Sequence, residues 1–334
     1  MVTLNASLTR IADFDCEPFD ISRKPRKSWA TGDYVIGRIT GPAGSKRLVE
    51  TVSGRIVEAF RDDIVIGAFG DRAGTLEAVG SWRDMRDDAM HAMTSAGLFG
   101  TVTSLSATVP SLTELEYLGH AVRSGKKVCM RDFAVDDDGE KPDVPIVLLF
   151  GTSMSAGKTT TGRRIVHELA TAGHNVIGVK LTGAGRYRDI LSFRDAGAVE
   201  IFDFVDAGLP STVVPEADFR AAVRPLLARI AALKPDVLVV EAGASPLEPY
   251  NGAAAIDELG DAIRCKVLCA SDPYAVVGVQ HAFGVTPDLV TGPAASTTAG
   301  IDLVQKLAGL PAVNVLDPAC GGPLRKLLDE TLML

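Results

Sequence analysis

Long apolar runs are missing from this sequence. No stretch approaches the roughly 18 uninterrupted apolar residues that a membrane-spanning helix needs, so we expect no membrane segment and no membrane partner. The first fifteen residues, MVTLNASLTRIADFD, lack a basic start followed by an apolar core. We therefore expect no signal peptide and predict a cytoplasmic location.

Cysteine is scarce and scattered. The five residues are odd in number, which predicts reduced thiols and not a disulfide framework; they are Cys16, Cys129, Cys265, Cys269 and Cys320. Cys265 and Cys269 lie four apart in RCKVLC, which has the composition of a buried strand. No further Cys or His cluster completes a zinc site beside them.

A surplus of positive charge is also absent. Lys and Arg number 34 against 42 Asp and Glu, so the formal net charge is −8 and the pI is near 5.2. Nucleic-acid binding needs a basic footprint, so we expect no nucleic-acid partner. The 334 residues are 46% apolar and 23% charged, which is ordinary globular composition and enough for two domains or one large α/β domain.

The first part of the chain has the pattern of a small β-rich domain. From about Gly32 to Trp82, short β-branched runs alternate with Gly, Asp and Ser, which predicts a small antiparallel sheet or barrel. Over residues 83–134 we expect helical and strand-like pieces to alternate, in RDDAMHAMTSAG, LTELEYLGHAVRSG and KKVCMRDFAV. Residues 1–134 are thus predicted to form a smaller, β-rich α+β domain, and the charged segment VDDDGEKPDV (135–144) a linker.

Residues 145–334 alternate apolar runs with helical segments. Such alternation predicts βαβ units and an α/β domain with a mainly parallel sheet. The predicted strands are 146–150, 175–180, 236–240, 266–270, 288–290 and 312–316.

The strongest motif lies between the first of these strands and a helix. GTSMSAGKTTT (151–161) has the small residues that let backbone N–H groups surround phosphates, and a helix N-terminus follows. We expect Lys158 to reach the β- and γ-phosphates, Thr159 to ligate Mg²⁺ and Thr160 to help hold the α-phosphate. The predicted phosphate-binding residues are Gly151, Thr152, Ser153, Met154, Ser155, Ala156, Gly157, Lys158, Thr159 and Thr160.

The spacing of this motif carries a family resemblance. The common P-loop pattern G-x-x-x-x-G-K-[ST] would need glycine at Thr152, but the glycine falls one place earlier, at Gly151. The form G-T-x-x-x-x-G-K-T resembles the loop of dethiobiotin synthetase and its relatives, a branch of P-loop proteins that includes cobyrinic-acid amide synthases and MinD-type ATPases. It is less similar to molybdopterin-guanine-dinucleotide adaptor proteins. The resemblance covers roughly residues 145–320, and residues 1–134 have no counterpart in dethiobiotin synthetase. It implies a P-loop NTPase domain and a homodimer.

Two residues at the ends of later strands fit the same branch. In dethiobiotin synthetases a lysine ends the strand that corresponds to NVIGVK and faces substrate and phosphates, which implies this role for Lys180; the alternative is a surface lysine that caps the strand. Glu241 directly follows DVLVV, where a Walker-B acid would bind Mg²⁺ directly or through water; the alternative is a carboxylate that ends its strand in solvent.

The segment GAGRYRDILSFRDAGAVE (183–200) offers further polar groups. We predict Asp189 as a second acidic group on the metal. Arg186 and Arg188 are predicted to bind phosphate or a substrate carboxylate, with a solvated helix face as the alternative. The loop PLEPYNG (246–252) is expected to shape the substrate site.

The sequence favours adenine over guanine as the base of the nucleotide. No Asn-Lys-x-Asp string for guanine is present, so we expect ATP with Mg²⁺ as cofactors, with residues 291–293 beside the base. The main hypothesis is an ATP-dependent kinase or ligase that phosphorylates a small-molecule carboxylate or similar acceptor, with Lys158 and Lys180 as catalytic residues. The alternatives are a nucleotide-driven switch or adaptor acting on a protein partner, and an acyltransferase whose P-loop binds the phosphates of coenzyme A.

Overall fold

The chain forms two compact units. The computed structural model describes residues 1–41, 47–243 and 245–333. Unit 1 comprises Met1–Asp136, Ala184–Arg188 and Phe204–Pro215, and unit 2 comprises Asp137–Gly183, Asp189–Asp203 and Glu216–Leu334. The first crossing lies within the predicted linker 135–144. The two later returns to unit 1 have no counterpart in the sequence prediction.

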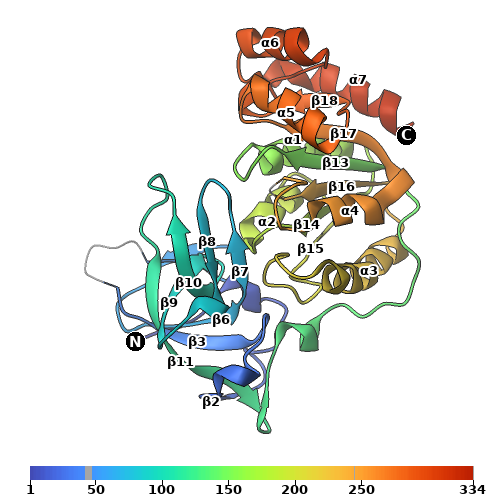
Figure 1. Cartoon of the computed structure of the whole chain (residues 1–334). Coiled ribbons are helices and arrows are strands. Elements are labelled where there is room, and N and C mark those ends of the chain that lie inside the picture. The colour runs from blue at the N-terminus through green and yellow to red at the C-terminus, as the bar shows by residue number, and fades with distance from the viewer. Residues whose placement is uncertain (42–46, 244, 334) are drawn as a thin grey trace. The chain divides into compact units, whose positions relative to one another are not determined.

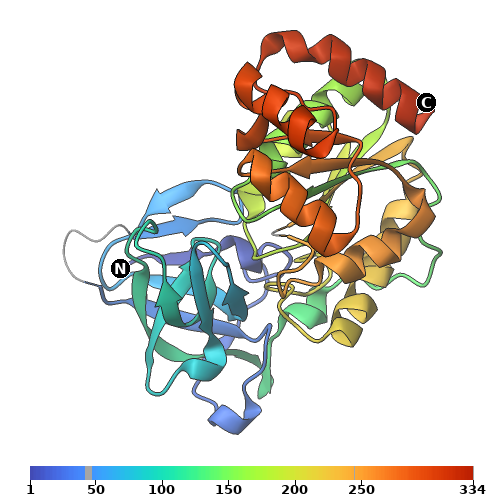
Figure 2. The ribbon, with the colours of Figure 1, turned by 45° about the horizontal axis from the view of Figure 1, so that its top comes forward.

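Unit 1 is built on a closed ring of strands (Figure 1). The ring runs β6–β3–β11–β9–β10 and returns to β6 because Leu98 and Phe99 of β10 pair with Ala68 and Phe69. Its members are β3 (Tyr34–Ile39), β6 (Ile64–Phe69), β9 (Ala89–Thr94), β10 (Leu98–Leu105) and β11 (Thr113–Arg123). The shorter strands β1 (Thr3–Asn5), β2 (Asp20–Ser22), β7 (Asp71–Ala73), β8 (Ala78–Ser81) and β12 (Lys126–Lys127) extend this sheet. A separate pair, β4 (Leu48–Glu50) and β5 (Ile56–Glu58), is light blue in Figure 2.

The ring encloses an apolar core. Alternate residues of the strands point inward, as the period of two requires. Buried core members include Val35, Ile39, Val65, Phe69, Met90, Phe99, Leu115 and Tyr117. At Gly67 a Cβ atom would lie 2.2 Å from the carbonyl oxygen of Gly97, so the close approach of the chains there requires glycine.

The prediction of helical pieces within residues 83–134 is wrong. Residues 86–97 contain β9, and residues 112–125 contain β11. Because β9 lies between β10 and β11 in the ring, backbone pairing outweighs the helix propensity of its Ala and Met residues. Apart from the first residues of α2, the helices in the described part of unit 1 are single 3₁₀ turns. They are η1 (Ser7–Thr9), η2 (Arg26–Ser28), η3 (Trp82–Asp84) and η4 (Met130–Phe133).

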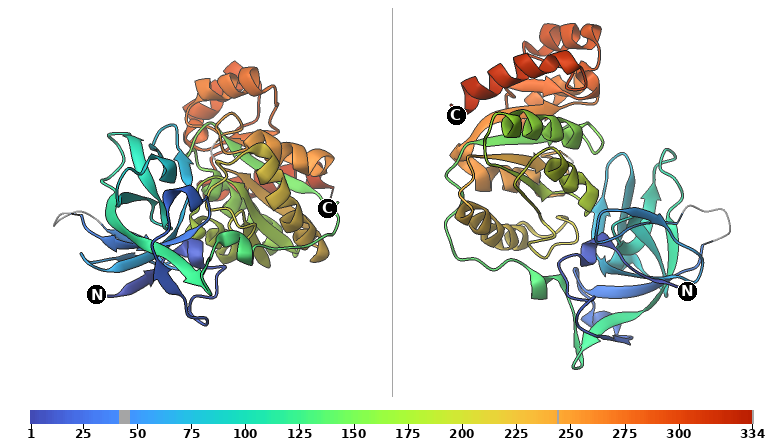
Figure 3. Two further views of the ribbon diagram at one scale, coloured as in Figure 1. Left: turned by 60° about the horizontal axis from the view of Figure 1, so that its bottom comes forward. Right: turned by 180° about the vertical axis from the view of Figure 1, so that it is seen from behind.

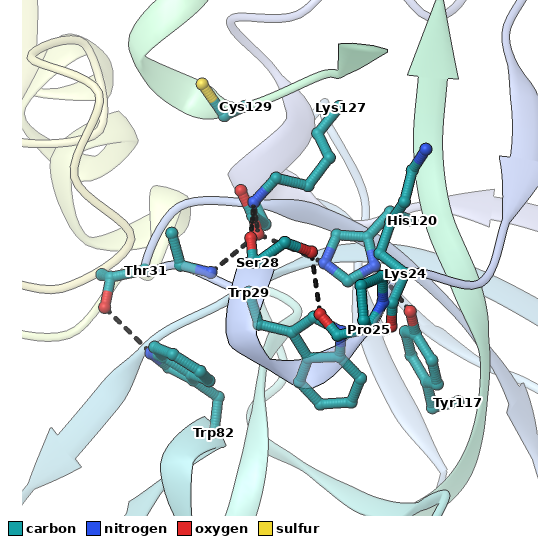
Figure 4. Close-up of polar contacts among 12 residues, drawn as sticks. Lys24, Pro25, Ser28, Trp29, Thr31, Trp82, Tyr117, His120, Lys127 and Cys129 are labelled. Carbon is teal, nitrogen blue, oxygen red and sulfur yellow. Dashed lines mark hydrogen bonds and ion pairs between the residues drawn. The ribbon is translucent and has the colours of Figure 1, made fainter. Parts of the chain in front are cut away.

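A buried polar network joins three strands of unit 1 (Figure 4). His120 of β11 is fully buried, with Nδ1 2.6 Å from the Tyr117 hydroxyl and Nε2 3.2 Å from the Asp33 carboxylate. The Lys127 ammonium binds the same carboxylate. Because a carboxylate only accepts, Nε2 of His120 donates to Asp33, and Nδ1 shares a hydrogen bond with the Tyr117 hydroxyl. Both ring nitrogens are therefore satisfied, and the network fastens β11 and β12 to the start of β3.

Unit 2 is an α/β domain with a fully parallel six-stranded sheet. The strand order is β15–β14–β16–β13–β17–β18. These strands are β13 (Ile146–Gly151), β14 (Val176–Thr182), β15 (Glu200–Asp203), β16 (Val237–Ala242), β17 (Ile263–Cys269) and β18 (Leu289–Thr291). Every residue of β13, β14 and β16 is buried, as continuous apolar runs require. The predicted α/β class with a parallel sheet is confirmed.

Helices flank the sheet of unit 2. α1 (Lys158–Thr171) contacts β13, β14 and β16 and packs against α7 (Gly321–Leu332), both seen from behind in the right panel of Figure 3. α4 (Gly252–Leu259) also contacts β14 and β16, and it packs against α3 (Glu216–Ala232). The remaining helices are α2 (Tyr187–Asp195), α5 (Pro273–Phe283), α6 (Thr298–Ala308), and the turns η5 (Gly260–Ala262), η6 (Pro293–Ala295) and η7 (Pro318–Cys320). None of the helices in the described ranges has the length and apolar character to cross a membrane.

The strands predicted for unit 2 differ from the structure in one wrong strand and one missed strand. Residues 312–316 form no strand, and Ala312 makes only an isolated bridge to Val290. Asn314 accepts a hydrogen bond from the Leu316 amide at 3.0 Å, so this segment turns toward η7. Conversely, β15 was not predicted, because its four residues lie between turn-forming segments and alternate only briefly.

Candidate functional site

The predicted phosphate loop joins β13 to α1 in unit 2. Residues 152–157 form the loop, and α1 begins at Lys158. Gly157 has φ +96° and Ser155 has φ +61°, so the backbone turns twice through the left-handed region. This curvature, followed by the N–H groups of a first helical turn, has the form of loops that bind anions at helix N-termini.

Lys158 is buried and turned back over its own loop. Its side chain is 5% exposed, and Nζ donates to the Ser153 carbonyl at 2.7 Å. Burial lowers the pKa of Lys158, and the negative charge of Glu241 partly opposes this. A Cβ atom at Gly151 would lie 2.9 Å from Nζ, so the glycine leaves the space that the lysine occupies.

Thr152 stands where the common motif has glycine. Its amide donates to the Cys269 carbonyl at 3.1 Å, and its Oγ1 accepts from the Ser271 amide at 3.1 Å. The threonine thus joins the start of the loop to the end of β17. Glycine could make the backbone bond but not the side-chain bond.

Glu241 lies at the end of β16, opposite Leu149 of β13 and Lys180 of β14 in the strand register. Its Oε2 accepts from the Thr159 hydroxyl at 2.9 Å. A hydroxyl beside one carboxylate suits Mg²⁺, which keeps water and phosphate oxygens as its other ligands. Over residues 1–41, 47–243 and 245–333, no group of three or more His, Cys, Asp or Glu forms a metal cage, as a structural zinc site would need.

Lys180 forms the second cationic element of the site. It is 6% exposed, which does not agree with a surface cap. Its Nζ lies 2.7 Å from Asp189 Oδ2 and 3.9 Å from Glu241 Oε1. Asp189, predicted as a metal group, therefore has Lys180 as a partner. The structure brings together Lys158, Thr159, Lys180, Asp189 and Glu241 from α1, β14, α2 and β16.

Glu248 was not predicted as a site residue. Its charge acts on Lys158 in the direction that raises the lysine pKa, so it lies within electrostatic range of the phosphate loop. The only sequence signal was a second acid shortly after Glu241 in a Pro-containing loop. Tyr250 of that loop is fully buried, which favours a packing role.

Residues 291–293, predicted beside the base, lie against the phosphate loop. Gly292 has φ +86°, and a Cβ atom there would be 2.4 Å from the Ala156 carbonyl oxygen. Asp272, which follows β17, caps α5 by accepting from the Tyr274 and Ala275 amides. Its Oδ1 thus caps the N-terminus of the helix.

Arg186 and Arg188 are exposed and belong to the segment Ala184–Arg188 of unit 1. Their contact with phosphate or a substrate carboxylate stays a prediction, as does the homodimer.

No family model matches the sequence, and no curated protein matches it. Similar solved structures include chloroplast FtsY from Physcomitrella patens, with 14% identity and TM-score 0.38 over 58% of this chain and 67% of that chain. A DUF1611 family protein from Anabaena variabilis has 18% identity and TM-score 0.38, over 57% of this chain and 58% of that one. HypB from Helicobacter pylori, in complex with nickel, has 15% identity and TM-score 0.37, over 57% and 87%. The chain spans less than two thirds of the DUF1611 protein. Similarity at this level identifies neither a family nor a function.

Proposed function

We propose that unit 2 binds ATP with Mg²⁺ and transfers the γ-phosphoryl group to a small-molecule carboxylate or similar acceptor, as a kinase or ligase. The observation that carries this proposal is the Thr159–Glu241 pair beside two buried lysines, Lys158 and Lys180. Phosphoryl transfer needs positioning and neutralisation of charge more than covalent chemistry by the protein. Two lysines with a hydroxyl–carboxylate metal pair supply both.

Each of these residues has a separate role in phosphoryl transfer. Lys158 exchanges the Ser153 carbonyl for the β- and γ-phosphate oxygens, which regains a charge-assisted hydrogen bond. Thr159 and Glu241 would hold Mg²⁺, and the bound ion would neutralise phosphate charge. Lys180 moves from Asp189 to the transferring group or the acceptor carboxylate, so that its charge acts where negative charge collects.

A nucleotide-driven switch is a second candidate. The chain enters unit 1 directly after β14 and again after β15, in segments 184–188 and 204–215. The first of these lies between Lys180 and Asp189 in sequence. A change at that ion pair on nucleotide binding or hydrolysis is therefore connected through the backbone to unit 1, where a protein partner could respond.

An acyltransferase that binds coenzyme A is a third candidate. Lys180 already contacts both Asp189 and Glu241, so the acidic side chains beside the loop are partly neutralised without a metal. A loop of this kind holds phosphates that take no part in the chemistry, and such binding would be independent of Mg²⁺.

The test is calorimetric binding of ATP, GTP and coenzyme A, each with Mg²⁺ and with EDTA, followed by turnover with a panel of small carboxylates. We expect ATP binding and carboxylate-stimulated turnover. Thr159→Val should weaken ATP binding in Mg²⁺ by roughly 10- to 100-fold, the value of one charge-assisted interaction, and change little in EDTA. The matched control is Thr171→Val at the exposed far end of α1.

Two results contradict the kinase or ligase, and a third contradicts the choice of ATP. Mg²⁺-independent binding of coenzyme A that exceeds ATP binding supports the acyltransferase. Slow hydrolysis that every carboxylate leaves unchanged supports the switch. A preference for GTP over ATP overturns the choice of base.

A further inference from the structure

Glu50 is a fully buried carboxylate in unit 1, at the end of β4. Its Oε1 accepts from the Ser7 hydroxyl at 2.5 Å and from the Tyr187 amide at 2.6 Å. Its Oε2 lies 3.4 Å from the Arg188 amide, which donates to it. A buried carboxylate destabilises the folded protein unless such donors surround it.

Two of these donors are the first amides of a helix. Tyr187 and Arg188 begin α2, and the first four N–H groups of a helix have no partner within it. The positive end of the helix dipole also favours a negative charge at this place. Glu50 therefore serves as the N-terminal cap of α2, although 137 residues separate it from Tyr187.

Other side chains of unit 1 hold the same segment. The Arg10 guanidinium lies 4.7 Å from the centre of the Tyr187 ring. The Gly185 amide donates to the Pro210 carbonyl at 3.2 Å, and a Cβ atom at Gly185 would meet Leu8 Cδ2 at 2.4 Å. The segment 184–188 is thus packed too closely to shift without disturbing unit 1.

The next residue along α2 is Asp189, the partner of Lys180. We propose that Glu50 is a positioning residue for the Lys180–Asp189 ion pair: by capping α2 it fixes the first helical turn, and the covalent chain carries this order to Asp189. The catalytic consequence rests on the proposed function, whereas the structural consequence does not.

The test compares Glu50→Gln with Glu58→Gln, an exposed glutamate on the paired strand β5. Glutamine keeps the size of Glu50 but loses the charge and places an amide donor near the helix N–H groups. We expect faster hydrogen exchange at the amides of Tyr187, Arg188 and Asp189 than in the control. We also expect kcat to fall by roughly tenfold to a hundredfold while the ATP Kd changes less than threefold, since a misplaced group costs catalysis more than phosphate binding. Glu50→Asp, which keeps the charge, should recover part of both effects.

Unchanged exchange at these amides in Glu50→Gln overturns the proposal, and so does a kcat equal to that of the control in a protein that turns over ATP. If Glu50→Gln does not fold, Ser7→Ala removes one donor to the carboxylate and the same two readouts decide. The exchange experiment needs no nucleotide. If the wild-type protein neither binds nor turns over ATP, the proposed function fails, and exchange still decides the role of Glu50.

Discussion

Lys158→Met should stabilise the free protein while abolishing nucleotide binding. Lys158 is 5% exposed, and burial lowers its pKa from the ordinary 10.5. A lowered lysine pKa means that the folded state disfavours the charged form relative to the unfolded state. Methionine is similar in length and carries no charge, so it removes this penalty along with the bond to the Ser153 carbonyl.

The expected gain follows from two opposed contributions. Losing the hydrogen bond to Ser153 costs about 1–3 kcal/mol, because a carbonyl then lacks its partner. Removing a buried charge increases the free energy of unfolding by several kcal/mol. Replacements of buried ionic groups by apolar ones are often neutral or stabilising by about 1–4 kcal/mol. Since desolvation is the largest contribution to the lowered pKa, we expect a net gain of about 1–2 kcal/mol at pH 7.

The stability of the wild-type protein should also depend on pH through Lys158. Between the folded and unfolded pKa values of Lys158, the unfolded state binds more protons, so wild-type stability rises with pH. The penalty is complete below the folded pKa and disappears as pH rises toward 10.5. The advantage of Lys158→Met should therefore shrink between pH 7 and pH 10.

The assay is urea unfolding at both pH values, with calorimetric ATP titration of the same samples. A variant that is less stable than the wild type at pH 7, or whose advantage grows with pH, refutes the electrostatic argument. Retained ATP binding refutes the assignment of the phosphate site.

Two further predictions concern other titrating groups. Burial raises the pKa of Cys265 to about 11 and that of Cys269 to about 12. Both thiols should therefore resist alkylation at pH 8 in the folded protein and react after unfolding. Rapid labelling of either thiol in the native protein, located by mass spectrometry, would contradict their burial. Hydrogen bonds from Arg224 and then Arg220 lower the pKa of Glu258 below its usual 4.5, so its contribution is present above pH 4.5 and is lost as pH falls through the folded pKa. Glu258→Gln should lose about 1 kcal/mol at pH 7 and little at pH 3 in urea unfolding, and an equal loss at both pH values would count against the charge.

Local patterns located most of unit 2. The apolar runs before Gly151, after Asn175 and before Glu241 became the buried strands β13, β14 and β16, because a strand covered on both faces needs such a run whatever its neighbours are. The phosphate loop is equally local, since its glycines and Lys158 act within a dozen residues. Lys180 and Glu241 were found as polar residues that end apolar runs.

Features that depend on distant partners were missed. Residues 86–97 contain the strand β9 because β10 and β11 pair with it. The sequence of the segment itself does not indicate those partners. Residues 184–188 return to unit 1, where Glu50 accepts hydrogen bonds from the Tyr187 and Arg188 amides, and in the sequence this glutamate resembles any other acid. Glu248 belongs to the same class, because its proximity to Lys158 arises from the path of a loop.

The capping of α2 by Glu50 has a consequence for synthesis of the chain. Unit 1 is not complete when its first 136 residues have left the ribosome, because Ala184–Arg188 and Phe204–Pro215 are also part of it. At about 5–20 residues per second, the 137 residues between Glu50 and Tyr187 take roughly 7–27 s to appear. During that interval the carboxylate lacks the two amide donors and must stay hydrated. Unit 1, the first to begin folding, is therefore completed only after about a third of unit 2 has been made. Cleavage of the chain at the linker would release neither unit intact.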